Sequence, residues 1–223
     1  MSGSIKCDGA DLCEELGGAD GTSFALTYGG DPPSRLIHQS SSIRILADLS
    51  PLVVGHLLVV PVAHYLSFSE LVVEQGAEVA ALLRDFLPRY RRAFGPPTVL
   101  EHGSSADMTT SACVTHAHWH VLPVSAVRIH ELIVADGLPV RELAGFVDLA
   151  EFAGRSYFYC SDGKFHRVYG IGGRMRSQYL RSVAGQVLGI PDPLWDYSLV
   201  VRRDYLRSTM LRAGHFFDQV VAL

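Results

Sequence analysis

The chain has 223 residues, of which 48% are hydrophobic and 19% charged, with a formal net charge of −4 at pH 7. This composition is that of a globular protein with room for one large domain or a domain plus an extension, and it gives no support for general nucleic-acid binding or for a membrane span. Four cysteines and an N-terminus without an apolar core lead us to expect a cytoplasmic protein with reduced thiols.

In the first third of the chain the sequence predicts turns followed by two strands. Residues 14–34 are rich in Gly, Asp and Pro and predict turns, with one short strand at Ser23–Thr27. Residues 42–47 and 56–62 are apolar and β-branched, which predicts two strands joined by a turn at Ser50-Pro51.

A long helix and two further strands are expected next. From Ser69 to Phe94 the apolar residues recur at helical spacing. Pro88 is expected to kink or interrupt this helix, because it lacks an N–H group and its ring clashes with the preceding turn. Val99–Gly103 and His116–Pro123 predict strands, separated by a polar loop long enough to reach a ligand.

The remaining sequence predicts a mixture of helices and a hairpin. Val140–Ala153 predicts a helix. Ser156–Gly170 predicts a β-hairpin, since Asp162-Gly163 is a strong turn signal. Ser177–Leu188 and Asp204–Gly214 predict two more helices, and no internal repeat is visible in the sequence.

Three histidines alternate in the run that begins at Thr115. In a strand, His116, His118 and His120 share one face, while Ala117 and Trp119 point to the other. Such a row suits a metal ion, which imidazole binds well, or a phosphate that one histidine attacks while the others donate hydrogen bonds. A purely structural row is less favoured, because burying three imidazoles without partners is costly.

The surrounding residues resemble the histidine-triad (HIT) superfamily of nucleotide hydrolases and transferases. The family pattern His-x-His-x-His with two following apolar residues matches the row, and Asp48-Leu49-Ser50-Pro51, Gly55-His56 and Pro61-Val62-Ala63-His64 match a second block in the same order. The resemblance covers roughly residues 5–125. It implies an α+β fold, a HIT-like antiparallel β-sheet with flanking helices.

Under this resemblance the chain divides into two parts. Residues 1–137 are expected to form a HIT-like nucleotide-binding catalytic domain. Residues 138–223 are expected to form a C-terminal α/β extension of a hairpin and helices, packed into the same domain or at a dimer interface. A homodimer is implied by the resemblance alone.

The resemblance also implies an activity, namely hydrolysis or transfer at the α-phosphate of a nucleoside phosphate derivative. His118 is expected to attack phosphorus and form a covalent nucleotidyl-histidine intermediate. His120 is expected to contact phosphate oxygens and His116 to support the row. His56 is expected to approach the same phosphate, and Asp48 to accept hydrogen bonds from the ribose hydroxyls, unless it is only a turn residue. The chemistry requires no cofactor, and the partner is a small nucleotide-type substrate.

The loop before the row departs from the family pattern. Many small relatives carry a serine three residues before the first histidine, where this chain has Cys113, with Ser111 two residues earlier. Both are candidates for contacts on the leaving-group side. Relatives also carry an asparagine before the glycine, where this chain has Glu101-His102-Gly103.

Some relatives bind a structural zinc ion, and three of the matching positions are retained here. They are Cys13, His64 and His116. The other cysteine of the family pair is replaced by Ala10, so Cys7 or Asp11 would have to supply the fourth ligand that structural zinc normally has.

Two alternatives to the enzyme remain open, a nucleotide-binding module whose catalysis has decayed and a zinc-dependent hydrolase that uses the histidine row as ligands. The charge distribution points to the second part of the chain for phosphate contacts, because residues 138–223 carry 11 Lys and Arg against 8 Asp and Glu, whereas residues 1–137 carry 8 against 15. The arginines at 174, 176 and 181 suit phosphate, although a solvated start of a helix is the favoured interpretation.

Overall fold

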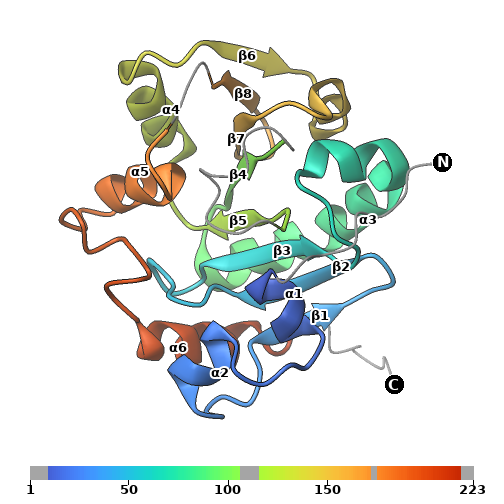
Figure 1. Ribbon diagram of the computed structural model, residues 1–223. Coiled ribbons are helices and arrows are strands. Elements are labelled where there is room, and N and C mark those ends of the chain that lie inside the picture. The colour runs from blue at the N-terminus through green and yellow to red at the C-terminus, as the bar shows by residue number, and fades with distance from the viewer. Residues whose placement is uncertain (1–9, 106–115, 172–174, 217–223) are drawn as a thin grey trace.

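The computed structural model describes residues 10–105, 116–171 and 175–216. Within these ranges the chain forms an eight-stranded antiparallel sheet in the order β1-β2-β3-β5-β4-β7-β8-β6, with helices on both faces (Figure 1). The expected α+β class and HIT-like antiparallel sheet are confirmed.

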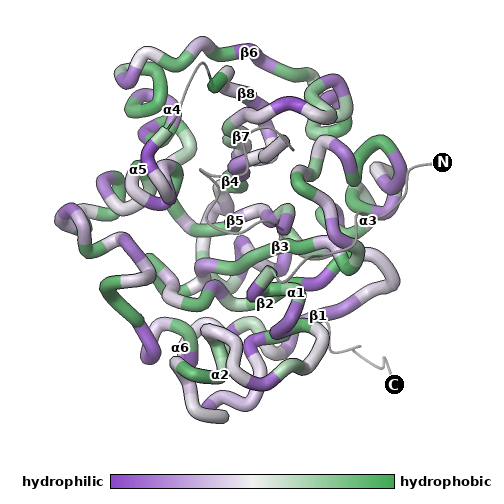
Figure 2. The backbone as a smooth tube through the Cα atoms, in the orientation of Figure 1, coloured by the Kyte–Doolittle hydropathy of each residue, from purple (hydrophilic) through white to green (hydrophobic). Residues whose placement is uncertain are grey.

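The first five strands come from the part of the chain that resembles the family. They are β1 (Leu36–Gln39), β2 (Ile43–Ala47), β3 (Leu57–Pro61), β4 (Thr98–Gly103) and β5 (Trp119–Leu122). β2 and β3 are joined through the expected turn at Ser50-Pro51. Every residue of β3 is buried, and this strand is largely green in Figure 2, which fits its position inside the sheet with both faces covered.

The last three strands come from the C-terminal part and continue the same sheet. They are β6 (Val140–Leu143), β7 (Tyr157–Ser161) and β8 (His166–Gly170). β7 pairs with β4 over its whole length, from Val99 opposite Ser161 to Gly103 opposite Tyr157. The β7–β8 hairpin is the one expected from Asp162-Gly163.

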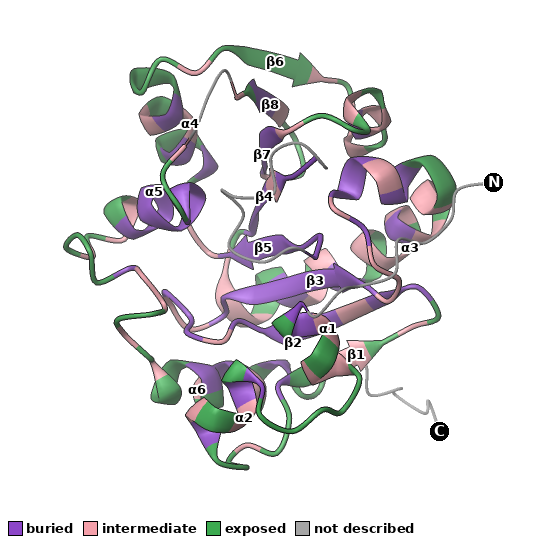
Figure 3. Ribbon diagram, viewed as in Figure 1, coloured by how far each residue is buried: buried purple, intermediate pink, exposed green. Residues whose placement is uncertain are grey.

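The helices form two layers. They are α1 (Asp11–Leu16), α2 (Ser23–Tyr28), α3 (Phe68–Phe94), α4 (Ala126–Ala135), the 3-10 helix η2 (Phe146–Phe152), α5 (Tyr179–Val187) and α6 (Arg203–Ala213). α2, α3, η2 and α6 contribute to the largest hydrophobic core, on one face. On the other face α4 and α5 cover β4, β7 and β8, while α1 covers β2 and β3. The strands β3, β5 and β7 are buried at every residue (Figure 3).

Two of the elements predicted from the sequence are wrong, and three observed elements were not predicted. Ser23–Thr27 lies in the helix α2, which the Thr22 side chain caps by accepting a hydrogen bond from the amide of Ala25. Val140–Ala153 is not one helix but the edge strand β6 followed by η2, because the apolar residues of 146–152 pack on α3 while 140–143 pair with β8. The helix α1, the strand β1 and the helix α4 were not expected.

The long helix bends at a different place from the one expected. Its backbone leaves helical geometry at Gln75, where φ is −132° and ψ is 25°, and it stays helical through Pro88. Pro88 therefore removes one hydrogen bond without breaking the helix. No helix in the described ranges combines the length and apolar character needed to cross a membrane.

Candidate active site

The histidine row sits on the sheet face between two helix-covered patches. His120 on β5 lies opposite Leu58 of β3 on one side and Leu100 of β4 on the other. Leu58 belongs to the small core under α1, and Leu100 to the core under α4 and α5. The alternating neighbours Ala117, Trp119 and Val121 pack into the main core on the opposite face, as expected.

The regular strand is shorter than expected, because β5 begins at Trp119 and His116 and His118 lie just before it. This irregular backbone lets His118 Nδ1 approach the carbonyl oxygen of His116 to 2.8 Å. A carbonyl only accepts, so Nδ1 carries the proton and Nε2 of His118 keeps its lone pair. Burial lowers the pKa of His118, which keeps the ring neutral and nucleophilic.

A second chain of hydrogen bonds fixes the protons on His56 and His120. The amide of Leu52 donates to Nδ1 of His56 over 3.2 Å, so the proton of His56 sits on Nε2. That N–H donates to Nδ1 of His120 over 2.9 Å. His120 therefore carries its own proton on Nε2, which has no other partner within the described residues. Burial lowers the pKa of both rings, that of His56 to about 4, so both are neutral.

Asp48 lies beside these two imidazoles and is itself buried. Its Oδ2 is 3.8 Å from Nε2 of His56 and 3.9 Å from Nδ1 of His120. Its Oδ1 accepts a hydrogen bond from the amide of Ser50 over 2.9 Å, which is the turn role that the sequence allowed. The turn role and a role at the site are therefore compatible.

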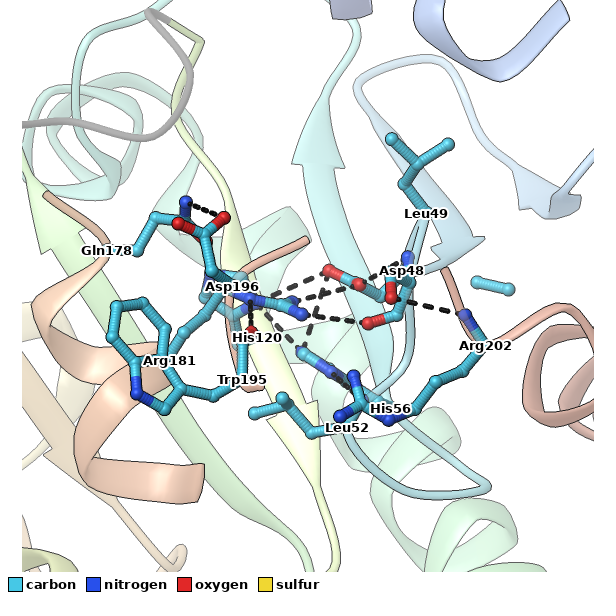
Figure 4. Close-up of polar contacts among 12 residues, drawn as sticks. Asp48, Leu49, Leu52, His56, His120, Gln178, Arg181, Trp195, Asp196 and Arg202 are labelled. Carbon is cyan, nitrogen blue, oxygen red and sulfur yellow. Dashed lines mark hydrogen bonds and ion pairs between the residues drawn. The ribbon is translucent and has the colours of Figure 1, made fainter. Parts of the chain in front are cut away.

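The C-terminal extension reaches this site through Arg181 of α5, whose side chain is 3% exposed (Figure 4). Its Nη1 donates to Oδ1 of Asp48 over 2.9 Å and its Nη2 to the carbonyl oxygen of Ser50 over 2.8 Å. Burial alone would raise the pKa of Asp48, but Arg181, followed by His56 and His120, holds that pKa below its usual value. The guanidinium thus keeps the carboxylate ionised.

The three residues expected to bind zinc come together at the other end of the row. Sγ of Cys13 lies 3.0 Å from Nδ1 of His116 and 3.4 Å from Nδ1 of His64. Nε2 of His116 donates to the carbonyl oxygen of Pro61 over 2.9 Å, so its Nδ1 presents a lone pair to this group. Such a carbonyl contact is typical of a metal-binding histidine. The three side chains fit a structural zinc ion and leave one ligand to be supplied.

Four further candidates were expected from the sequence, and only Asp11 among them lies in the described residues. Ser111, Cys113 and Cys7 lie outside the described residues. Asp11 is not part of the group around Cys13 and accepts a hydrogen bond from the amide of Ser23 instead. His116 turns its ring toward Cys13 and His64, and it supports His118 through its carbonyl oxygen rather than through the ring.

Sequence reasoning did not predict the role of Arg181 at the site or of Glu101 on the opposite face of the sheet. A solvated position was the favoured interpretation of Arg181, because nothing in the sequence shows that α5 folds back over the turn at Ser50. Glu101 was noted only as a departure from the family, yet its buried carboxylate accepts hydrogen bonds from the amide of Phe68, from Trp119 Nε1 and from the Tyr157 hydroxyl. The sequence signal that could have indicated this buried carboxylate is a lone acidic residue in an apolar strand.

Comparison with known proteins finds partial structural similarity. No family model matches the sequence, and no curated protein matches it. A HIT-like protein involved in cell-cycle regulation from Bartonella henselae is 21% identical, with 47% of this chain and 80% of that chain covered and a TM-score of 0.35. A zinc-bound histidine triad family protein from Mycobacterium smegmatis is 24% identical, with 45% and 72% covered and a TM-score of 0.34.

A histidine triad nucleotide-binding protein from Sulfolobus tokodaii is 18% identical, with 45% of this chain and 67% of that chain covered and a TM-score of 0.35. All three matches cover less than half of this chain, so the roles of individual residues rest on their own contacts. The alternating histidines, the Asp48-to-Pro51 turn and Gly55-His56 lie on or beside one antiparallel sheet, so the chain resembles the histidine-triad family in its motifs and in its fold class, and a C-terminal extension follows.

Proposed function

We propose that the protein is a nucleotide hydrolase or nucleotidyl transferase that acts on the α-phosphate of a nucleoside phosphate derivative through a nucleotidyl intermediate on His118. The observation that carries the proposal is the pair of fixed tautomers. Nε2 of His118 has a lone pair and no hydrogen bond within the described residues, while Nε2 of the neighbouring His120 holds a proton. The ring of His118 can therefore attack phosphorus while the ring of His120 donates a hydrogen bond to an oxygen of the same phosphoryl group.

The reaction then proceeds in two displacements. The lone pair of His118 forms a P–N bond, and the bond from phosphorus to the leaving group breaks with its electron pair. Water then attacks the same phosphorus and releases a proton to solvent, the P–N bond breaks, and its electron pair returns to Nε2 of His118. In both steps the N–H of His120 stabilises negative charge on a phosphate oxygen. The retained His120 favours water over a second nucleotide as the acceptor.

Asp48 supplies the expected contact to the ribose. Its Oδ1 is occupied by Ser50 and Arg181, but Oδ2 makes no hydrogen bond to a described residue, and it faces His56 and His120. A carboxylate oxygen in this position accepts a hydrogen bond from a hydroxyl of the substrate. The proposal therefore assigns the substrate as a ribonucleoside phosphate derivative.

The test is turnover of nucleoside 5′-phosphoramidates and dinucleoside polyphosphates, combined with mass detection of a nucleotidyl adduct after rapid quenching. The wild type is expected to form an adduct on His118, and His118→Ala to lose turnover with its melting temperature unchanged. His130→Ala is the matched control, because His130 lies on α4 and bonds to the hydroxyl of Tyr169. Full turnover by His118→Ala would refute the mechanism.

A zinc-dependent hydrolase is the second candidate, because Asp48, His56 and His120 present three ligand atoms within 4.8 Å of one another. The position of Arg181 argues against it, since a divalent cation in this group would lie next to a buried guanidinium that already neutralises Asp48. Turnover that survives exhaustive chelation would exclude this candidate. Zinc is instead proposed for Cys13, His64 and His116, in a structural role.

A further inference from the structure

A fourth histidine lies on the same face as the row. On β4 the side chain of Leu100 packs into the core under α4 and α5, whereas Glu101 points to the opposite face and contacts Trp119. Because side chains alternate along a strand, His102 shares the face of Leu100. That face carries His118 and His120, so His102 belongs to the site surface.

The strand register places His102 beside the proposed nucleophile. Leu100 lies opposite His120 and Glu101 opposite Trp119. This is the last pair of the two strands, so His102, the next residue of β4, lies at the end of the pairing from which His118 precedes β5. The electrostatic influence of His118 on His102 agrees with this placement: burial, followed by His118, lowers the pKa of His102 to about 4.

The extension holds the His102 ring in place but leaves its nitrogens open. The ring packs edge-on against Phe158 of β7 with 4.8 Å between centroids, and Phe158 stacks on Tyr179 at the start of α5. Within the described residues neither ring nitrogen of His102 makes a hydrogen bond. This differs from His56, both of whose ring nitrogens are used.

We propose that His102 is a substrate-binding residue of the same site, whose ring N–H donates a hydrogen bond to an oxygen of the phosphoryl group that His118 attacks. The inference rests on the proposed function. The neutral ring offers one N–H from β4, whereas His120 donates from β5. The phosphoryl group would therefore be held by donors from two neighbouring strands, β4 and β5.

The kinetic test compares two replacements of His102 with adenosine 5′-phosphoramidate as substrate. His102→Phe keeps an aromatic ring against Phe158 but has no donor, and it is expected to lower kcat by about 10²–10³-fold, as for the loss of one donor to a developing oxyanion. His102→Asn restores a donor and is expected to recover part of the loss. If His102 only fills space, His102→Phe retains full activity and the inference is wrong.

The binding test separates this inference from the proposed function. Histidine-selective ¹⁵N spectra are recorded for the full chain while AMP, GMP, CMP and UMP are added separately, with assignments from His102→Asn and His118→Asn. Shifts of both His102 and His118 with any of the four nucleotides support the inference. A shift of His118 without His102 overturns the inference and leaves the function standing. No shift of either ring overturns both.

Discussion

At the scale of single residues, the buried ion pair between Asp48 and Arg181 joins the site to the extension. The two side chains are 7% and 3% exposed and share a 2.9 Å contact. A buried pair contributes little over an apolar replacement of both partners, but removing one partner leaves a buried charge without compensation. The pair therefore makes the site depend on α5.

We predict that Arg181→Met lowers the free energy of unfolding by about 3–5 kcal/mol, the usual cost of breaking a buried pair. The measurement is urea denaturation. Arg207→Met is the control, because Arg207 pairs with Asp31 on the surface and its loss is expected to cost less than about 1 kcal/mol. Adding Asp48→Asn to Arg181→Met is expected to recover more than half of the loss. Equal losses of unfolding free energy in Arg181→Met and Arg207→Met would contradict the structural role of Arg181.

The buried carboxyl group of Glu101 is expected to make a pH-dependent contribution to the stability of the protein. Burial raises its pKa from 4.5 to about 7, against three hydrogen bonds that lower it. Because the folded pKa lies above the unfolded one, the folded state binds the extra proton, and the contribution of Glu101 to stability is fully present below pH 4.5 and is lost as the pH rises through about 7. The difference corresponds to about 3 kcal/mol at 1.36 kcal/mol per pKa unit.

We predict that the free energy of unfolding of wild type minus that of Glu101→Gln falls by about 3 kcal/mol between pH 4.5 and 8, because the other titrating groups contribute equally to both proteins. The amide cannot titrate, but its NH₂ group meets the donors of Phe68 and Trp119, so the variant is also expected to be less stable at every pH. A difference between the two proteins that stays constant with pH would assign the pH dependence to other groups.

At the scale of elements, α1 is linked to the rest of the protein through Cys13. Only Leu12 of this six-residue helix is buried, so packing alone holds it weakly. A zinc ion bound by Cys13, His64 and His116 would join α1 to the segments that follow β3 and precede β5. Metal binding is then part of the folding free energy.

We predict that zinc-loaded wild type loses at least about 4 °C of melting temperature on chelation, which corresponds to about 1–2 kcal/mol for a chain of this size. Cys13→Ala is expected to melt at the lower temperature with or without the chelator, and its zinc content by elemental analysis is expected to fall below one ion per chain. Cys160→Ala is the control, since Cys160 is buried under α4 and is not part of this group. Identical responses of the two variants would contradict the zinc site.

The elements that sequence reasoning predicted are those with a local signal. The apolar runs of β2 and β3 and the Asp162-Gly163 turn of the β7–β8 hairpin specify their own structure. Ser23–Thr27 has the β-forming residues Phe and Thr, but Thr22 caps a helix there and the side chains of Phe24 and Tyr28 pack into the main core. In this segment the tertiary contacts outweighed the local propensity.

At the site, too, only the residues with a local sequence signal could be predicted. The alternating histidines and Asp48 were predicted because a short motif carries them, and the structure brings His56, His120 and Asp48 into contact. Arg181 was not predicted, because its partner is 133 residues away in the chain. No periodicity or turn signal reports a contact of that separation.

At the scale of the whole molecule, the sheet contains a topological repeat that the sequence does not reveal. β3, α3, β4 and β5 follow one another as strand, helix, strand and strand, and β6, η2, β7 and β8 do the same. The two sets meet at the β4–β7 pair, so that the spatial order β3-β5-β4 is mirrored by β7-β8-β6. α3 and η2 pack against each other across this junction.

The two halves of the repeat are chemically different. Where β5 places His120 opposite Leu100, β8 places Arg167 opposite Cys160. The second half therefore has no histidine row at the matching position. It contributes instead to the first half, through the pairing of β7 with β4, the contact of Phe158 with His102, and Arg181. This arrangement predicts that the extension is needed for the first half to fold.

We predict that residues 1–137 alone do not form a stable monomer. Truncation exposes the whole edge of β4, which invites pairing with other chains, and it leaves Asp48 buried without Arg181. Size-exclusion chromatography and calorimetry are expected to show aggregates without a cooperative transition, and co-expression of residues 138–223 as a separate chain is expected to restore a soluble complex. A monomeric 1–137 fragment that melts cooperatively near the wild-type temperature would show that the extension is an independent addition, and that Arg181 and β7 are dispensable for the fold of the histidine-bearing half.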